Sequence, residues 1–265
     1  MGEGAESALA APGPDFVGIG AQKSGTTWLG DVLAQHPGVY IRKKEISFFV
    51  QNFHRGFEWY HEFFRDKGAR RAGELTVSYL ITPRSDPAHK ETYPRWNPRR
   101  ALLFWRSQPS AREELVAHYP EVRVFVILRN PVDRAWSHYW YWRRRRERLG
   151  KRVVSFERMF EDDGRWIQSY GHYADYLPAW LETFPDLGIF FYDDIETDPL
   201  GLARRIYRFI GVDDSFDPEV RKQMNPGRYE RLPDELRKRL VEVYADSNQR
   251  LVELTGRDLA DWSRV

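Results

Sequence analysis

Cysteine is absent from the 265-residue sequence. This excludes disulfide bonds, thiolate metal ligands and cysteine nucleophiles, and it is compatible with a reducing compartment. Long apolar runs are also missing, because none approaches the roughly 20 residues that a membrane-spanning helix needs. We therefore expect a cytoplasmic protein without a membrane span.

A large charge imbalance is missing as well. The 41 basic and 39 acidic side chains leave a net charge of +2, which gives no case for a nucleic-acid partner. No set of histidine, aspartate and glutamate residues has the spacing of metal ligands, and no metal is predicted. Hydrophobic residues make up 42% and charged residues 30% of the chain, as in ordinary globular proteins.

The N-terminal residues differ in composition from the rest. Residues 1–14 are small and rich in glycine, alanine and proline, and they lack the basic flank and apolar stretch of a signal peptide. We predict a disordered leader over residues 1–14 and a single domain over residues 15–265.

Three segments repeat the order of a strand followed by a helix. The predicted strands cover residues 16–20, 122–128 and 188–192, and the predicted helices that follow them cover 26–35, 131–146 and 199–210. Apolar strands alternating with helices favour a parallel sheet covered on both faces, with ligands at the carboxyl ends of its strands. The predicted fold class is a single α/β domain with a central parallel sheet flanked by helices.

Other segments have helical spacing or none. Further helices are expected over residues 57–65, 155–161, 173–184 and 233–254. Residues 82–108 are rich in proline, arginine and tryptophan without periodicity, which predicts a long loop or insertion near the site.

A phosphate-type loop follows the first predicted strand. Its two glycines, Gly20 and Gly25, have the spacing of a P-loop, but Thr26 stands where that motif has lysine, and the lysine lies at Lys23. Glycine lets backbone amides approach an anion, and the N-terminus of the next helix adds partial positive charge. A tight strand-to-helix turn without a ligand is the alternative.

The position of the lysine before the second glycine distinguishes this loop from an ordinary P-loop and identifies a more specific resemblance. The segment Gln22-Lys23-Ser24-Gly25-Thr26-Thr27-Trp28-Leu29 resembles the 5′-phosphosulfate loop of sulfotransferases. The resemblance implies that Lys23 contacts the bridging oxygen of the co-substrate 3′-phosphoadenosine-5′-phosphosulfate (PAPS). It also implies that the 5′-phosphate is held by Ser24, Gly25, Thr26 and Thr27. Trp28 either stacks on the adenine or packs in the core.

A second element fits the 3′-phosphate of the same nucleotide. Residues 128–139 resemble the family's 3′-phosphate element, which implies that Arg129 and Ser137 bind that phosphate through a guanidinium fork and a hydroxyl. An ion pair of Arg129 with Asp133 or another carboxylate is the alternative. Gly227 and Arg228 resemble a late loop that closes over the nucleotide.

The segment Lys44-Glu45-Ile46-Ser47-Phe48-Phe49 resembles the Lys-Glu-x-x-Phe-Phe segment of the heparan-sulfate branch, which includes N-deacetylase/N-sulfotransferases and 3-O-sulfotransferases. There the glutamate is the catalytic base, so the resemblance implies that Glu45 is the base and that Lys44 holds it in position. A carboxylate suits this role because the acceptor loses a proton as it attacks sulfur. An ion-paired surface Lys-Glu is the alternative.

Two features leave the acceptor and the base open. Leu75 replaces a lysine that carbohydrate-modifying relatives often have at this position, so the class of acceptor stays in doubt. Other sulfotransferase branches use histidine as the base, and the histidines near recognisable segments are His54, His61, His138 and His172.

The sequence thus predicts a PAPS-dependent sulfotransferase. It would transfer a sulfuryl group to a hydroxyl or amine of a carbohydrate or small-molecule acceptor and release the 3′,5′-bisphosphate (PAP). A P-loop kinase and a non-catalytic nucleotide- or polyanion-binding module are the alternatives, although the kinase needs its lysine after the second glycine. The basic run over residues 143–148 predicts a solvated helix end or a patch for an anionic acceptor or nucleic acid.

Overall fold

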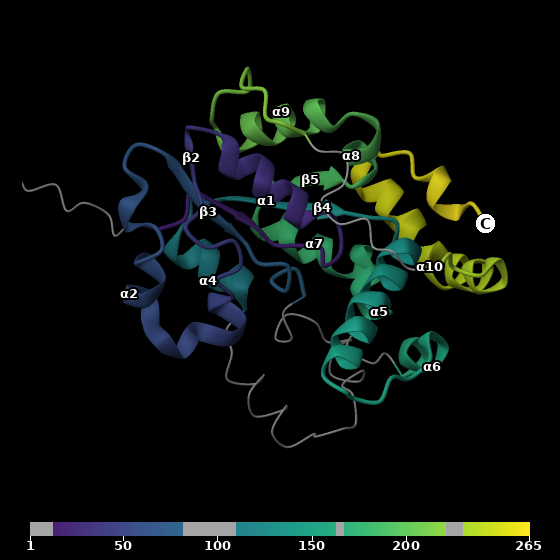
Figure 1. Cartoon of the computed structure of the whole chain (residues 1–265). Helices are drawn as coiled ribbons and strands as arrows, with labels where there is room; N and C mark the ends of the chain where they lie inside the picture. Colours follow the sequence, from purple (N-terminus) through teal and green to yellow (C-terminus); the bar gives the residue numbers. More distant parts are fainter. Residues whose placement is uncertain (1–12, 82–109, 163–166, 221–229) are drawn as a thin grey trace, which may run out of the picture.

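Five parallel strands form one sheet in the order β2-β3-β1-β4-β5 in the computed structural model (Figure 1), which describes residues 13–81, 110–162, 167–220 and 230–265. The strands are β1 (Phe16–Gly18), β2 (Val39–Tyr40), β3 (Arg71–Leu75), β4 (Arg123–Leu128) and β5 (Gly188–Phe191). The predicted α/β class with a central parallel sheet is confirmed.

Helices cover both faces of the sheet because the central strands are apolar on both sides. Along β4, Phe125 and Ile127 join the core that contains α1 (Thr26–Gln35) and α9 (Pro199–Ile210). The alternate residues Val124 and Val126 join the opposite core, which contains α4 (Ala111–His118) and α7 (Tyr173–Thr183). Figure 1 shows the first pair of helices above the sheet and the second pair below it.

The remaining helices surround this three-layer centre. They are α2 (Gly56–His61), α5 (Pro131–Arg148), α6 (Phe156–Glu161), α8 (Asp193–Thr197) and α10 (Asp234–Thr255). The start of α5 is fixed by Pro131 in its first turn and by Asn130, whose side chain accepts a hydrogen bond from the backbone nitrogen of Val132 at 3.0 Å.

The structure confirms the helix after each predicted strand and adds elements that the sequence pattern did not indicate. β2, β3, α4 and α8 were not predicted, and the helix expected over residues 57–65 consists of α2 and a separate 3₁₀ turn at Arg65–Lys67. The predicted insertion over 82–108 lies outside the described residues. The same is true of the predicted leader apart from Gly13 and Pro14.

The order of the strands places a crevice at the carboxyl end of β1. From β1 the chain continues to β2 and β3 on one side and later returns to β4 on the other. In open α/β sheets, ligands bind where the strand order changes direction in this way. Within the described ranges, no helix combines the length and the apolar character needed to cross a membrane.

Candidate active site

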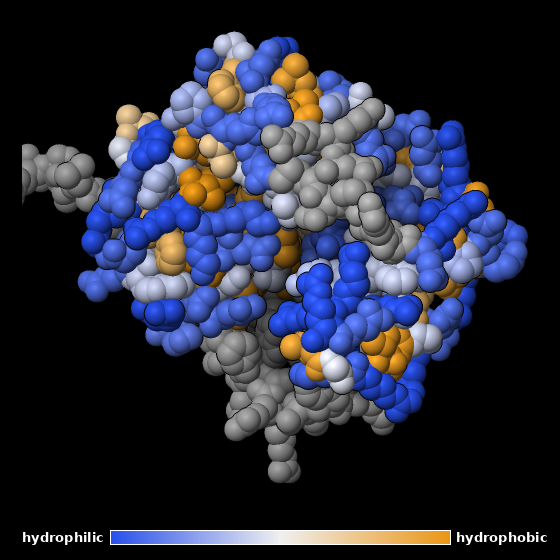
Figure 2. All heavy atoms as spheres, viewed as in Figure 1, coloured by the Kyte–Doolittle hydropathy of each residue, from blue (hydrophilic) through white to orange (hydrophobic). Residues whose placement is uncertain are grey.

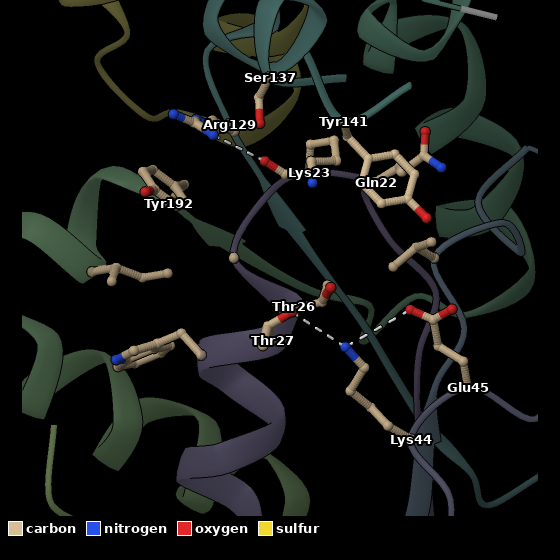
Figure 3. Close-up of a pocket in the computed structure, with 14 residues that line it drawn as sticks. Gln22, Lys23, Thr26, Thr27, Lys44, Glu45, Arg129, Ser137, Tyr141 and Tyr192 are labelled. Atoms are coloured by element: carbon tan, nitrogen blue, oxygen red, sulfur yellow. Dashed lines mark hydrogen bonds and ion pairs between the residues drawn. The ribbon is translucent and has the colours of Figure 1, made fainter. Parts of the chain in front are cut away.

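A cavity of about 310 Å³ lies at the carboxyl ends of β1 and β4 (Figure 3). The predicted site residues that line it are Lys23, Gly25, Thr26, Thr27, Trp28, Lys44, Glu45, Arg129 and Ser137. Ser24 is fully buried and does not line the cavity, and Gly227 and Arg228 lie outside the described residues. The fold therefore brings residues 22–28 and 44–45 together with residues 129–137, which lie about a hundred positions later in the sequence.

The loop before α1 has a backbone that requires glycine. Gly25 has φ 87° and precedes the first helical residue, Thr26. A Cβ atom at Gly25 would lie 2.5 Å from Cδ1 of Ile195. Lys23 also has a positive φ of 69°. The tight loop leaves the first backbone N–H groups of α1 directed at the cavity, which favours an anion there.

Lys23 and Arg129 form the cationic side of the cavity. Nη1 of Arg129 donates a hydrogen bond to the backbone carbonyl of Lys23 at 3.2 Å. Burial lowers the pKa of the Lys23 ammonium below its usual range, and the positive charges of Arg129, Arg144 and Lys44 lower it further. The ammonium lies 4.7 Å from the centre of the Tyr141 ring.

Arg129 is available for a ligand. Its guanidinium carbon lies 4.2 Å from the centre of the Tyr192 ring, and no carboxylate of the described residues forms a salt bridge with it. The alternative pairing with Asp133 is wrong, because Asp133 pairs with Arg237 at 2.7 Å. Ser137 lines the same cavity from α5 and is 7% exposed.

Lys44 and Glu45 form the opposite wall. Nζ of Lys44 lies 3.5 Å from Oγ1 of Thr27 and 3.8 Å from Oε1 of Glu45 (Figure 3). The side chain of Glu45 is 46% exposed, so its carboxylate remains open to the cavity. Lys44 thus connects the phosphate-type loop to Glu45.

A second cavity of about 670 Å³ adjoins the first. Both cavities are lined by Gln22, Glu45, Val77 and Tyr141. The further lining residues of the larger cavity are Ser47, Val50, Gln51, Ser78, Ile81, His138, Trp142, Arg145 and Tyr170. Residues between Glu45 and Ile81 therefore supply one wall of this cavity, and α5 supplies another wall that was not predicted.

The lining of the cavities distinguishes one candidate histidine from the other three. Of His54, His61, His138 and His172, only His138 lines either cavity. Leu75 lines neither, since it is 1% exposed in the core beside α1. Among the described residues there is no group of three or more histidine, aspartate or glutamate side chains that could hold a metal ion.

The basic run at the end of α5 has two environments. Arg143 pairs with Glu147 at 2.9 Å, and Arg146 donates a hydrogen bond to the carbonyl of Arg152 at 2.6 Å. Arg145, in contrast, lines the larger cavity. Figure 2 shows hydrophilic side chains over α5 on this face of the molecule. The run is thus partly a solvated helix end and partly a cavity wall.

Tyr141 and Tyr192 are site residues that the sequence reasoning missed. Tyr141 lies four residues after Ser137 on α5, so helical spacing alone places the two side chains on one face. Tyr192 directly follows β5 and therefore lies at the carboxyl edge of the sheet. The helical spacing of Tyr141 from Ser137 and the place of Tyr192 at the end of a strand could both have been read from the predicted helix and strand.

Residues 13–232 match the family model of the sulfotransferase domain. The chain belongs to the sulfotransferase domain family. It is 28% identical over 217 residues to human bifunctional heparan sulfate N-deacetylase/N-sulfotransferase 3, covering 75% of this chain and 22% of that protein. It is 27% identical over 274 residues to human heparan sulfate glucosamine 3-O-sulfotransferase 6, covering 92% of this chain and 72% of that protein.

The fold matches a solved sulfotransferase as well. The crystal structure of a sulfotransferase from Alicyclobacillus acidocaldarius aligns with a TM-score of 0.73 and 26% identity over 95% of this chain and 99% of that one. The predicted family and the resemblance to its heparan-sulfate branch are confirmed. Membership of this family favours sulfuryl transfer over the kinase alternative.

Proposed function

We propose that this sulfotransferase moves a sulfuryl group from PAPS to a hydroxyl or amine of a carbohydrate or small-molecule acceptor, and that it does so in the cytoplasm. The observation that carries the proposal is the position of Glu45, which lines both cavities. A carboxylate at this junction can take a proton from an acceptor in the larger cavity while the sulfuryl donor occupies the smaller one.

The smaller cavity offers two separate sites for anions. The loop before α1 and Lys23 suit the 5′-phosphosulfate, whereas Arg129 and Ser137 suit a 3′-phosphate. Trp28 is 5% exposed, so only a small part of its ring is available to an adenine. Two anion sites in one cavity support a nucleotide with phosphates at both positions.

The transfer itself needs few steps. Glu45 accepts the proton of the acceptor O–H or N–H, the acceptor atom forms a bond to sulfur, and the bond from sulfur to the bridging oxygen of PAPS breaks. PAP leaves with the electron pair of that bond. The Lys23 ammonium and the backbone amides of the loop stabilise the negative charge that develops on the bridging oxygen.

The larger cavity supports a carbohydrate as the first acceptor class to test. Two relatives carry heparan sulfate in their names, one of them with glucosamine. The aromatic side chains of Tyr141, Trp142 and Tyr170 line the cavity together with polar ones, including Ser47 and Gln51. Apolar ring faces with a few hydrogen-bonding groups suit a sugar.

Transfer of labelled sulfate from PAPS tests the proposal directly. We expect label in at least one of four acceptors: a heparan sulfate oligosaccharide, glucosamine, 2-phenylethanol and 4-nitrophenol. PAP formation should match the label transferred, and Glu45→Gln should lose it. Tight binding of PAP by calorimetry without turnover of PAPS on any acceptor would instead identify a non-catalytic nucleotide-binding module.

A further inference from the structure

A fully buried carboxylate, Glu74, lies directly behind the segment that carries Glu45. Glu74 is the fourth residue of β3 and has no exposed surface. It lines neither cavity and has no cationic partner among the described residues. A buried carboxylate without a counter-ion is costly, so its hydrogen-bond donors must account for its presence.

Four donors point at this carboxylate. Oε1 accepts from the hydroxyls of Tyr60 at 2.7 Å and Tyr79 at 3.0 Å. Oε2 accepts from the backbone nitrogen of Ile46 at 3.0 Å and from the hydroxyl of Thr76 at 2.5 Å. An ionised carboxylate has about four acceptor positions, so this set fills it. Burial raises the pKa of the Glu74 carboxyl, and the four hydrogen bonds oppose the rise.

Two of these donors also accept hydrogen bonds from the backbone that follows Glu45. The Thr76 hydroxyl accepts from the backbone nitrogen of Ser47 at 3.1 Å. The Tyr79 hydroxyl accepts from the backbone nitrogen of Phe48 at 2.8 Å. Because each hydroxyl gives its own proton to Glu74, its oxygen is left as the acceptor for these amides. Glu74 therefore determines the direction of both hydroxyls.

Glu45 is held from both sides as a result. Before it, the carbonyl of Lys44 accepts from the backbone nitrogen of Leu75 at 2.7 Å. After it, the backbone nitrogen of Ile46 donates to Glu74. Ser47 then turns with a positive φ of 55°, a conformation that a serine keeps only when its surroundings enforce it.

We propose that Glu74 is a positioning residue, which fixes the backbone of residues 44–48 so that the Glu45 carboxylate stands at the junction of the two cavities. The inference rests on the proposed function, in which Glu45 is the base. The same network shapes the larger cavity, because Ser47 in the anchored turn and Val50 and Gln51 just after it line that cavity.

A purely structural role for Glu74 predicts a different pattern. Loss of a buried hydrogen-bond set would then lower stability without a particular effect on residues 46–49 or on proton transfer. A positioning role requires that the backbone of this segment loosens and that the effect on turnover passes through Glu45.

Amide hydrogen exchange separates the two roles without any ligand. In Glu74→Gln, which keeps the shape but presents N–H groups to existing donors, we expect exchange at Ile46, Ser47 and Phe48 to accelerate about tenfold or more, the factor associated with one charge-assisted hydrogen bond. Exchange in α1 should stay as in the native protein. Unchanged exchange at residues 46–48, or equal acceleration throughout the chain, overturns the proposal.

A second variant covers the case in which Glu74→Gln does not fold. Tyr79→Phe keeps the carboxylate and removes the hydroxyl that accepts from Phe48. Its matched control is Tyr207→Phe, since Tyr207 is equally buried and its hydroxyl donates to the carbonyl of Val32 at 2.8 Å, away from this segment. Faster exchange at Phe48 in the first variant alone supports the proposal, and equal exchange there in both variants overturns it.

Turnover tests the connection to Glu45. With labelled PAPS and the acceptor that the native enzyme turns over best among the four probes, Glu74→Gln should lower kcat by about 10²-fold, as expected for a small displacement of a reacting group, with PAP affinity unchanged. In a Glu45→Gln background the same substitution should have no further effect. Losses that multiply refute positioning through Glu45, whereas native turnover of Glu45→Gln refutes the base assignment and this inference together.

Discussion

The guanidinium of Arg129 donates a hydrogen bond to the backbone carbonyl of Lys23, with 3.2 Å between Nη1 and the oxygen. The two residues are 106 positions apart in the sequence and belong to the two phosphate-type elements. A side chain that is expected to bind the 3′-phosphate therefore also supports the loop that is expected to bind the 5′-phosphosulfate.

Substitution of Arg129 should remove the preference for a 3′-phosphate. We expect the native protein to bind PAP more tightly than 5′-AMP, and Arg129→Ala to lose about 1.5 to 3 kcal/mol of that difference, the value of a charge-assisted hydrogen bond. Calorimetry with both nucleotides measures it. Arg204→Ala is the control, because Arg204 pairs with Asp217 at 2.7 Å and lines neither cavity. Equal native affinity for PAP and 5′-AMP would reject the assignment.

Removal of the Lys23 ammonium should act on turnover more than on nucleotide affinity. The charge on the bridging oxygen develops only as the bond to sulfur breaks, so an interaction with it is strongest in the transition state. We expect Lys23→Ala to lose most of kcat while PAP affinity falls far less, and the native enzyme to remain active in excess EDTA. Lys67→Ala, which removes a lysine paired with Asp15 at 2.8 Å, serves as the control. Activity that disappears in EDTA and returns with magnesium would contradict this prediction.

Nucleotide binding should weaken at alkaline pH. Burial and the neighbouring cations lower the pKa of Lys23 from 10.5, so in the free protein the ammonium loses its proton at a lower pH than an ordinary lysine. A bound phosphate favours the charged form, so PAP affinity should fall as pH rises through the lowered pKa, and binding in that range should take up a proton. Calorimetry in buffers of different ionisation enthalpy measures the uptake. Lys23→Arg should bind PAP without this decline, and an identical decline in that variant would show that another group titrates.

The fold could be predicted from the sequence where the strands are apolar throughout. β4 contains five consecutive apolar residues and β1 is entirely apolar or glycine, so both strands stood out, as did the helices that follow them. β3 has the sequence Arg-Ala-Gly-Glu-Leu, and its buried glutamate hides the strand pattern. The burial of that glutamate is compensated by the hydroxyls of Tyr60 and Tyr79, which reach it from other segments and which no local pattern reveals.

The candidate site was predictable to a similar degree. Most residues expected to bind the nucleotide lie shortly after β1 and β4, so sheet geometry brings them together at one edge. The wall that α5 adds to the larger cavity depends on how that helix packs, and the sequence pattern did not indicate it. His138 gained importance only when the structure placed it there.

The prediction of the general base is the one most affected by the wall that α5 adds to the larger cavity, because that wall includes His138. Glu45 lines both cavities, whereas His138 lines only the larger one. Glu45→Gln keeps the shape of the side chain but removes its proton acceptor, so turnover should fall by about 10² to 10⁴-fold. PAP binding should change little, because the groups expected to hold the nucleotide are intact. His138→Ala should retain most of kcat, and its effect should appear mainly in KM for the acceptor.

The acceptor's own acidity sharpens the comparison. A phenol of low pKa, such as 4-nitrophenol, needs little help to lose its proton, so Glu45→Gln should affect it less than 2-phenylethanol. The rate with 2-phenylethanol divided by the rate with 4-nitrophenol is compared between Glu45→Gln and His138→Ala. The variant that lacks the base should have the lower ratio. If His138→Ala abolishes transfer to the aliphatic alcohol in a folded protein while Glu45→Gln remains near native, the base is His138. Glu45 would then act only as the ion-pair partner of Lys44, and the chain would belong mechanistically with the histidine-using sulfotransferases.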